Sequence, residues 1–492
     1  MIYKSTRGND TRTASQAILK GLAQDGGLFI PEYIPKMEMP LKELAELDYR
    51  GLAYEVMKLY LTDFTEEELM ACINNAYDDK FDTEAIAPLT YADGAYYLEL
   101  FHGPTIAFKD MALQILPHLM TTAARKNDLK DDIVILTATS GDTGKAALEG
   151  FKDVPGTRII VFYPKDGVSR VQEKQMLTTG GENTSVVGIY GNFDQAQTGV
   201  KNIFSDGDMA SLLEEHGFVF SSANSINIGR LVPQVVYYWH AYLTLLREEK
   251  IADGEPVNIC VPTGNFGNIL AAYLAKEMGM PVNKLICASN SNKVLYDFFT
   301  TEVYDKNRDF FVTSSPSMDI LVSSNLERLI YFITGDDPAK TAKLFGELNS
   351  EGRYEIDDEM NKGLAGFAAG FATEEETASE IAQVYNDTGY VIDTHTAVAS
   401  FVNRQYREAS GDEHACVIAS TASPFKFGGS VMKAIDPSYE ETDDYTLAED
   451  LAKTAGVDIP QAVLILRDAP IRHDIQCAPE DMKDTVKKIL GI

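Results

Sequence analysis

From about residue 93 onward, short apolar runs rich in β-branched residues alternate with helical segments. Strands that are apolar along their whole length are typical of a parallel sheet covered by helices on both faces. The pattern therefore predicts an α/β fold. The runs that we expect to form strands are residues 133–138, 158–163, 184–189, 259–261, 285–288 and 415–419.

The segments that flank this core are mainly helical. Residues 1 to about 90 contain an expected helix over 14–22 and a second helix opened by a capping box of Thr65 and Glu68. Another capping box, Thr373 and Glu376, opens a helix in the stretch from about 300 to 390, which we interpret as an elaboration of the core. The segment after Asp436 is rich in Asp and Glu and is typical of a solvated face.

The balance of charge restricts the possible partners. The chain has 43 Lys and Arg against 74 Asp and Glu, a formal net charge of −31, which repels nucleic acid and anionic lipid. No apolar run approaches the roughly 20 residues of a membrane helix, and the first residues lack a secretory apolar segment, so we expect a cytoplasmic protein without a membrane partner. The five cysteines form no CxxC pair, and we expect no metal site.

One candidate site follows the strand expected at 133–138, because ligands of open α/β sheets bind beyond the carboxyl ends of strands. It is the run Ser140, Gly141, Asp142, Thr143 and Gly144. Backbone amides at the start of a helix, flanked by hydroxyl groups, suit a carboxylate or a phosphate. A simple helix cap would explain the same residues.

A second candidate site is the run Gly264, Asn265, Phe266, Gly267 and Asn268, between the strand at 259–261 and a helix expected over 269–278. A glycine-interrupted loop at a helix start can hold a phosphate dianion with N–H groups and the helix dipole. The run lacks the leading GxG of the dinucleotide fingerprint, so a phosphate fits better than a pyrophosphate. A structural turn is the alternative.

Two further segments carry lysines that could act in a site. Lys109 lies in an apolar segment at the start of an expected helix, where partial desolvation would lower its pKa and favour the neutral amine of Schiff-base chemistry. The alternative is a lysine whose stem packs while its head reaches water. Thr421 and Lys426 follow the strand at 415–419 and offer a hydroxyl for a ring nitrogen and a local cation.

With these motifs in order along nearly the whole chain, the sequence resembles the threonine synthases, pyridoxal-phosphate enzymes of the tryptophan-synthase-β fold, fold type II. Other matching segments are residues 5–8, 25–28, 224–227, 315–320 and 424–427. The resemblance implies two α/β sheet domains and an N-terminal mainly helical domain. The implied boundaries are 1–92 for the N-terminal domain, 93–130 with 231–435 for the large cofactor-binding domain, 131–230 for the smaller domain and 436–492 for an acidic, helical C-terminal segment.

The resemblance also implies roles for individual residues. Lys109 corresponds to the lysine that forms a Schiff base with pyridoxal 5'-phosphate and later shuttles protons. Residues 264–268 correspond to the loop that binds the cofactor phosphate, and Thr421 corresponds to the hydroxyl partner of the pyridine nitrogen. Residues 140–144 are expected to lie against the substrate carboxylate and the cofactor, and Asn227, Arg230 and Lys426 are candidates for the substrate phosphate.

The implied reaction converts O-phospho-L-homoserine and water into L-threonine and phosphate by γ-elimination and β-addition of water. A related alternative is a phospho-lyase of the threonine-synthase-like type, which stops at a 2-oxo acid. A protein that binds a phosphometabolite without catalysis is a third reading. The expected partner is a small-molecule substrate, and the expected assembly is a monomer or a homodimer.

Overall fold

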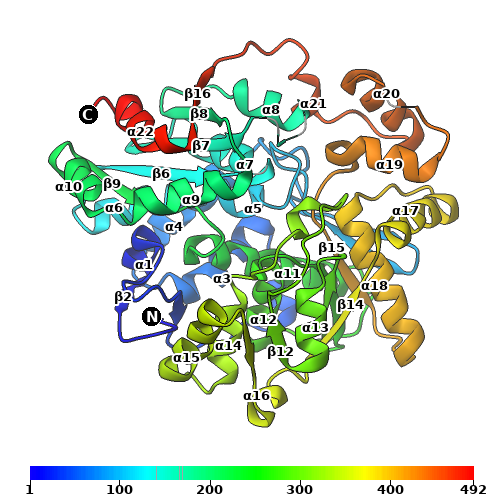
Figure 1. Cartoon of the computed structure of the whole chain (residues 1–492). Coiled ribbons are helices and arrows are strands. Elements are labelled where there is room, and N and C mark those ends of the chain that lie inside the picture. Colours follow the sequence, from blue (N-terminus) through cyan, green and yellow to red (C-terminus); the bar gives the residue numbers. More distant parts are fainter. Residues whose placement is uncertain (140, 166, 169, 441) are drawn as a thin grey trace.

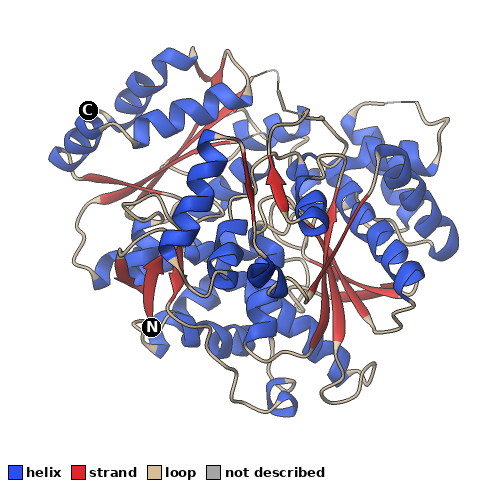
Figure 2. Ribbon diagram, turned by 60° about the horizontal axis from the view of Figure 1, so that its bottom comes forward, coloured by secondary structure: helices blue, strands red, loops and turns tan. Residues whose placement is uncertain are grey.

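The computed structural model describes residues 1–139, 141–165, 167–168, 170–440 and 442–492. Its framework consists of two large sheets that lie on opposite sides of a group of central helices (Figure 2). None of the helices in these ranges combines the length and the apolar character needed to cross a membrane. The predicted α/β class is confirmed.

The larger sheet has six strands in the described part of the chain. In spatial order they are β14 (Phe367–Phe371), β11 (Val282–Ser289), β10 (Val257–Pro262), β15 (Cys416–Ser420), β5 (Ala95–Glu99) and β4 (Leu89–Ala92). All neighbours are parallel except β4 and β5, which form an antiparallel hairpin around Asp93 and Gly94, both at positive φ. Every residue of β10 and β15 is buried, as a strand covered on both faces requires.

The second sheet has five parallel strands within the described ranges. Their order is β16 (Ile475–Cys477), β8 (Thr184–Ile189), β7 (Thr157–Pro164), β6 (Asp132–Ala138) and β9 (Phe218–Ser221). The strand β16 comes from the acidic C-terminal segment, so this segment completes the edge of the second sheet (Figure 1). All six strands predicted from the sequence are confirmed.

The N-terminal region adds an antiparallel sheet that the sequence did not predict. It consists of β1 (Ile2–Ser5), β2 (Thr11–Thr13) and β3 (Phe29–Pro31), in the order β2-β1-β3. Strands this short carry too few residues for a clear alternation of apolar and polar side chains. The helices of this region are α1 (Ala14–Lys20), α2 (Leu41–Leu44), α3 (Tyr49–Tyr60) and α4 (Glu66–Ala76), and the capping box of Thr65 and Glu68 is present.

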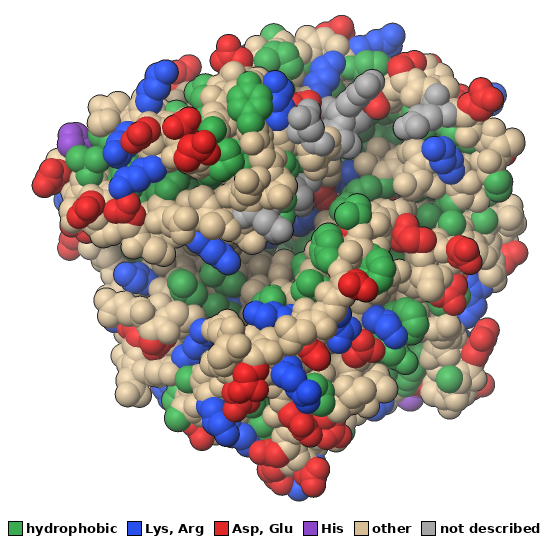
Figure 3. All heavy atoms as spheres, in the orientation of Figure 1, with side chains coloured by type: hydrophobic (Ala, Val, Ile, Leu, Met, Phe, Trp, Pro, Cys, Tyr) green, Lys and Arg blue, Asp and Glu red, His purple; other side chains and the backbone are tan. Residues whose placement is uncertain are grey.

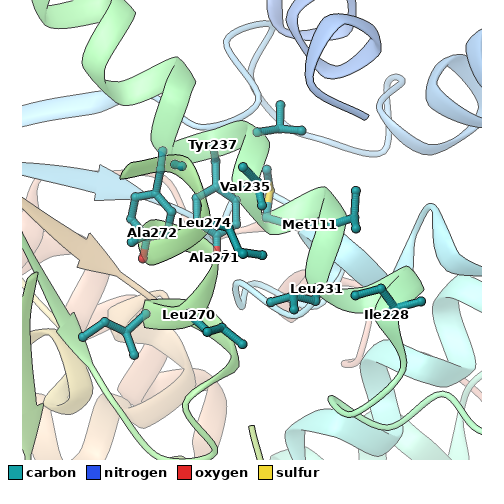
Figure 4. Close-up of a cluster of buried hydrophobic side chains, with 14 of the residues drawn as sticks. Met111, Ile228, Leu231, Val235, Tyr237, Leu270, Ala271, Ala272 and Leu274 are labelled. Carbon is teal, nitrogen blue, oxygen red and sulfur yellow. The ribbon is translucent and has the colours of Figure 1, made fainter. Parts of the chain in front are cut away.

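A long buried helix, α11 (Ile228–Arg247), connects the parts of the molecule that matter for the site. It packs against α5 (Asp110–Leu113) and α12 (Gly267–Glu277), and Figure 4 shows Met111 of α5 and Leu270 of α12 within one cluster around it. The helix that follows Lys109 and the helix that follows Gly264 are therefore fixed on the same support. The stability of this support comes from apolar burial rather than from exposed polar contacts.

The remaining helices complete the described part of the fold. They are α6 (Leu116–Lys126), α7 (Asp142–Phe151), α8 (Arg170–Leu177), α9 (Phe193–Phe204), α10 (Gly207–Glu215), α13 (Val294–Thr301), α14 (Leu326–Ile333), α15 (Pro338–Ser350), α16 (Asp358–Lys362), α17 (Glu374–Thr388), α18 (Thr394–Ser410), α19 (Gly428–Ile435), α20 (Asp444–Ala455), α21 (Gln461–Leu464) and α22 (Met482–Leu490). Short 3-10 helices are η1 (Pro316–Met318), η2 (Pro424–Phe427) and η3 (Pro479–Asp481), and a small hairpin pairs β12 (Val303–Asp305) with β13 (Arg353–Glu355).

The stretch from about 300 to 390 is mainly helical as predicted, and the capping box of Thr373 and Glu376 is confirmed. It is also joined to the core, because β14 belongs to the larger sheet. The predicted division of the chain into domains stays a prediction.

Candidate active site

Lys109 lies in the loop between β5 and α5, at the N-terminal end of α5. The N–H of Phe108, the preceding residue, donates to the carbonyl of Thr421 at 2.8 Å, so the loops after the neighbouring strands β5 and β15 run side by side. This pairing places Thr421 next to the lysine segment, because the carboxyl ends of neighbouring parallel strands lie at the same edge of a sheet.

The amine of Lys109 is largely buried and has two polar neighbours. Its Nζ lies 3.1 Å from Oγ of Ser317 and 3.5 Å from Oδ2 of Asp142, and 11% of its side chain is exposed. Burial lowers the pKa of Lys109; the charge of Asp142 opposes this shift, and the cations Lys426 and Arg230 add to it. The lysine is therefore biased toward the neutral amine.

Asp142, the first residue of α7, lies between two lysines. Its Oδ1 accepts from Nε2 of Gln172 at 2.9 Å and lies 3.2 Å from Nζ of Lys426, on the side opposite to Lys109. Burial alone would raise the pKa of Asp142, but the charges of Lys426 and Lys109 outweigh burial and hold the pKa below its ordinary value. Asp142 is thus an ionised carboxylate that contacts the amines of both lysines.

The turn before α7 is tightly built. Gly141 adopts a φ of 142°, and the N–H groups of Gly141 and Gly144 both donate to Oγ1 of Thr139, at 2.9 and 3.0 Å. A Cβ on Gly144 would lie 2.5 Å from Cγ2 of Thr139, so glycine is required there. Thr143 stays partly exposed and available to a ligand, whereas the predicted residue Ser140 lies outside the described residues.

The loop from Gly264 to Asn268 ends β10 and begins α12, as predicted. Phe266, the N-terminal cap of the helix, is buried and adopts a left-handed conformation with φ 63°. The first N–H groups of a helix have no acceptor within the helix and carry its positive dipole end. This loop therefore has a helix start of the kind that can bind an anion.

A segment from η1 to α14 clamps the loop from the outside. The Oγ of Ser323 donates to the carbonyl of Gly264 at 2.7 Å, and the backbone N and Nδ2 of Asn325 donate to the carbonyl of Asn265 at 3.0 and 3.1 Å. A Cβ on Gly264 would lie only 2.6 Å from the carbonyl oxygen of Ser317. The loop is therefore held without using its N–H groups.

Asn268 provides an unused donor at this place. Its Oδ1 accepts hydrogen bonds from the hydroxyls of Tyr237 and Tyr238 on α11, which fixes the orientation of the amide. Its buried Nδ2 has no partner among the residues that the structure describes. A buried donor without a partner is costly, so this atom fits an acceptor supplied by a ligand.

Arg230, near the start of α11, has the same property. Its Nη1 donates to the carbonyl of Ala223 at 3.0 Å, but its buried Nε has no partner in the described ranges. Burial lowers the pKa of Arg230 to about 10. A buried guanidinium that lacks a carboxylate partner fits a bidentate anionic ligand.

Asn227 differs from the other predicted residues. It caps α11, and its Oδ1 accepts from the N–H of Gly229, while its Nδ2 donates to the carbonyls of Ile18 and Ser222 at 2.9 and 2.8 Å. These protein contacts use the polar atoms of the side chain. The expected role of Asn227 in binding the substrate phosphate stays a prediction.

Other residues of the site were missed by the sequence reasoning. Gln172, Ser317 and His395 contact the Lys109–Asp142 pair or each other, and the N–H of Ser317 donates to Nε2 of His395 at 3.2 Å. Residues 315–320 were noted only as a matching segment, because η1 lacks the strand-turn-helix pattern that marks a ligand loop. The surface view shows a hollow between the part of the molecule with α7 and the part with α11 and α12 (Figure 3).

Comparisons with known proteins agree with this arrangement. Residues 2–77 match the family model described as threonine synthase N terminus, and residues 89–421 match that of pyridoxal-phosphate dependent enzymes. A threonine synthase of Pseudomonas aeruginosa is 38% identical, with 88% of this chain and 90% of that protein covered. The structure of the pyridoxal-phosphate-bound threonine synthase from Brucella melitensis has a TM-score of 0.86 at 33% identity and covers both chains completely.

A protein named threonine synthase-like 1 from Pongo abelii is 42% identical over 86% of this chain. This chain covers 58% of that relative, so it spans little more than half of its length. The yeast threonine synthase structure has a TM-score of 0.88 at 31% identity and covers 100% of this chain and 99% of its own. The predicted fold and the predicted cofactor, pyridoxal 5'-phosphate, are confirmed, and the chain belongs to the threonine synthase family of pyridoxal-phosphate dependent enzymes.

Proposed function

We propose that this protein is a threonine synthase, which converts O-phospho-L-homoserine and water into L-threonine and phosphate, the last step of threonine biosynthesis. The substrate carries a phosphate and a carboxylate, and the cofactor carries a second phosphate. The observation that carries the proposal is the charge of the site: Lys426 and Arg230 are buried, Lys109 is largely buried, and the carboxylate of Asp142 contacts both lysines. Buried cations in excess of their anionic partners favour ligands with several negative charges.

We assign the cofactor to one side of this site. Pyridoxal phosphate, when bound, supplies an electron-withdrawing ring that acidifies protons of an amino-acid substrate. Lys109 provides the amine for its aldehyde, and residues 264–268 provide N–H groups at the start of α12 for its phosphate. The unpaired Nδ2 of Asn268 adds a donor, and the hydroxyl of Thr421 serves the ring nitrogen.

The remaining residues serve the substrate. Lys109, with its lowered pKa, removes and returns protons on the substrate carbons, since a neutral amine is the form that can act as a base. The turn at 141–144 binds the substrate carboxylate. Arg230 and Lys426 bind the leaving phosphate, and the contact of Lys426 with Asp142 holds the lysine in place.

The second candidate is a phospho-lyase of the threonine-synthase-like type. This candidate is supported by the 42% identity to threonine synthase-like 1, which is higher than the 38% identity to the Pseudomonas threonine synthase. Both reactions begin with the same substrate contacts and release phosphate. They differ in whether water is added to the carbon chain before release.

A product assay decides between the two. Purified protein with pyridoxal phosphate and O-phospho-L-homoserine should release phosphate and form an equal amount of L-threonine. Formation of 2-oxobutyrate and ammonia in place of threonine would establish the lyase. Absence of both products, with phosphate not released, would contradict either function.

A further inference from the structure

Ser317, on the short helix η1, joins three parts of the site through three different atoms. Its Oγ lies 3.1 Å from Nζ of Lys109, and its backbone N–H donates to Nε2 of His395 at 3.2 Å. Its carbonyl oxygen packs against Gly264, where a Cβ would lie 2.6 Å away. One residue therefore contacts the lysine, the helix α18 and the loop that begins α12.

The direction of the hydrogen bonds follows from the chemistry of the partners. The Oγ of Ser317 also lies 3.3 Å from Oδ2 of Asp142. An ionised carboxylate can only accept, so the hydroxyl proton of Ser317 points to Asp142. The lone pairs of Ser317 are then left for an N–H of Lys109, and the serine acts as an acceptor toward the amine.

The backbone of Ser317 is held by a histidine in one defined form. The Nδ1 of His395 lies 2.8 Å from Oδ2 of Asp393, and its Nε2 faces the N–H of Ser317. A carboxylate accepts and a backbone N–H donates, which assigns the proton of the ring to Nδ1. Asp393 is itself fixed, because it caps α18 and accepts from the N–H groups of His395 and Thr396.

We propose that Ser317 is a positioning residue for Lys109. Its hydroxyl oxygen accepts a hydrogen bond from one N–H of the amine, and Asp142 accepts from a second N–H. The third position on Nζ is then aimed at the carbon that exchanges a proton. His395 and Asp393 hold Ser317 in the place that this requires. The inference rests on the proposed role of Lys109 as the proton-transferring amine.

The surroundings of Lys109 leave few other groups that could direct its amine. Asp142 faces it from α7, Lys426 from η2 and Arg230 from α11, and the ring of Phe108 has its centre 5.7 Å from Nζ. The cations repel the amine and a ring face attracts it without a defined direction. Among the described residues, Ser317 and Asp142 are the acceptors within hydrogen-bond distance of Nζ.

The test compares Ser317→Ala with the conservative Ser317→Thr and with a matched control, Ser350→Ala, at the exposed end of α15. Ser317→Ala should lower kcat on the order of 100-fold while KM changes less than about threefold, because the substrate contacts remain. Ser317→Thr retains the hydroxyl and should recover most of this loss. Ser350→Ala should match the wild-type protein.

A second measurement needs no substrate. The full-length protein, stripped of cofactor, is mixed with pyridoxal phosphate at a series of pH values, and the rate of its capture is followed by absorbance. Loss of an acceptor destabilises the charged form of Lys109, so Ser317→Ala should shift the midpoint of the profile to lower pH by roughly half a unit or more. Ser317→Thr should restore the midpoint.

The two measurements separate the possible failures. An unchanged capture profile together with a wild-type kcat in Ser317→Ala would overturn the role of Ser317. If the wild-type protein formed no threonine, the proposed reaction would fail, but a shifted capture profile would still support the contact between Ser317 and Lys109. His395→Gln is a second variant, at a residue that contacts Ser317 and not Nζ. It should lower kcat and shift the midpoint of the capture profile to lower pH, each by less than Ser317→Ala does.

Discussion

The Nζ of Lys426 lies 3.2 Å from Oδ1 of Asp142, a residue 284 positions earlier in the chain. The Nζ of Lys109 lies 3.5 Å from Oδ2 of the same carboxylate. The carboxylate therefore lies between the two lysine amines and contacts each of them through a different oxygen. Each lysine can then serve a different ligand group, one an aldehyde and the other a phosphate.

Replacing this carboxylate by an amide should disturb both lysines. In Asp142→Asn the amide offers one oxygen, and its NH2 group must face donors on one side, either Lys109 with Ser317 or Lys426 with Gln172. The loss of negative charge also lowers the pKa of Lys109 further. We expect turnover to fall on the order of 100-fold or more, with the pH profile of cofactor capture displaced to lower pH.

The matched control for this change is Asp208→Asn on the exposed surface of α10, which removes the same charge far from the site. It should leave turnover and the capture profile unchanged. Equal behaviour of the two variants would show that the carboxylate of Asp142 does not govern the lysines.

Replacement of two buried arginines, Arg328 and Arg230, by methionine should have different effects on the stability of the protein. Arg328 donates from Nε to the carbonyl of Phe29 and from Nη2 to that of Ile226, so Arg328→Met should lower the free energy of unfolding on the order of 3 kcal/mol. Arg230 has an unpaired Nε, and Arg230→Met should leave the unliganded protein equally or more stable.

The same pair of variants tests the phosphate role. Inorganic phosphate should raise the Tm of the wild-type protein, and Arg230→Met should abolish most of this increase. Thermal unfolding with and without phosphate measures both effects. A strong loss of stability in unliganded Arg230→Met, with the phosphate effect intact, would be the opposite of this expectation.

The fold was predictable where local patterns are strong. The strands β6, β7, β8, β10, β11 and β15 each contain a buried apolar stretch, because neighbouring strands and helices cover them. The edge strand β14 was missed, since its sequence Phe-Ala-Ala-Gly-Phe is partly exposed and has few β-branched residues. The strand β16 has three residues, too few for a periodic pattern.

Within the loop of residues 264–268, Gly264 should be the position that tolerates substitution least. A methyl group there would lie 2.6 Å from the carbonyl of Ser317, so Gly264→Ala must displace either the loop or η1. We expect cofactor affinity to fall roughly 10-fold or more, measured by absorbance titration with pyridoxal phosphate. The control Gly346→Ala, in α15 with no atom within 4 Å of the new Cβ, should keep wild-type affinity.

The comparison of Gly264→Ala with Gly346→Ala is decisive because each variant adds one methyl group. If both bound the cofactor as the wild-type protein does, the loop would not be clamped against Ser317 in solution.

His102 should make stability depend on pH. Burial would lower its pKa, but its hydrogen bonds to the carboxylates of Asp82 and Glu99 outweigh burial and raise the pKa to about 9. Because the folded pKa lies above the usual value of about 6.5, this contribution is complete below about pH 6.5 and is lost as pH rises through about 9.

Urea unfolding of the wild-type protein and of His102→Gln measures this contribution. The stability difference between them should be on the order of 2 kcal/mol near pH 6 and should shrink toward zero above about pH 10. A difference that stayed constant over this range would contradict the ionic role of His102.

The sequence predicts the loops of the site but not the residues that hold these loops in place. Gly264 and Asp142 follow closely after β10 and β6, strands of two different sheets, and ligands of α/β sheets bind beyond such strand ends. Lys109 lies in the longer loop between β5 and α5, where its apolar segment marked it. Ser317 and His395 reach the site only through tertiary packing of the segment that precedes α14 and of α18. No local spacing in the sequence reports such a contact.

The attachment point of the cofactor tests the account most directly. The wild-type protein is incubated with pyridoxal phosphate, reduced with borohydride, digested and analysed by mass spectrometry, with Lys145→Met as a control for another buried lysine. We predict that one pyridoxyl group is found per chain, on the peptide that contains Lys109, and that Lys145→Met is labelled equally. Label on a different lysine, or no label at all, would contradict the site described here.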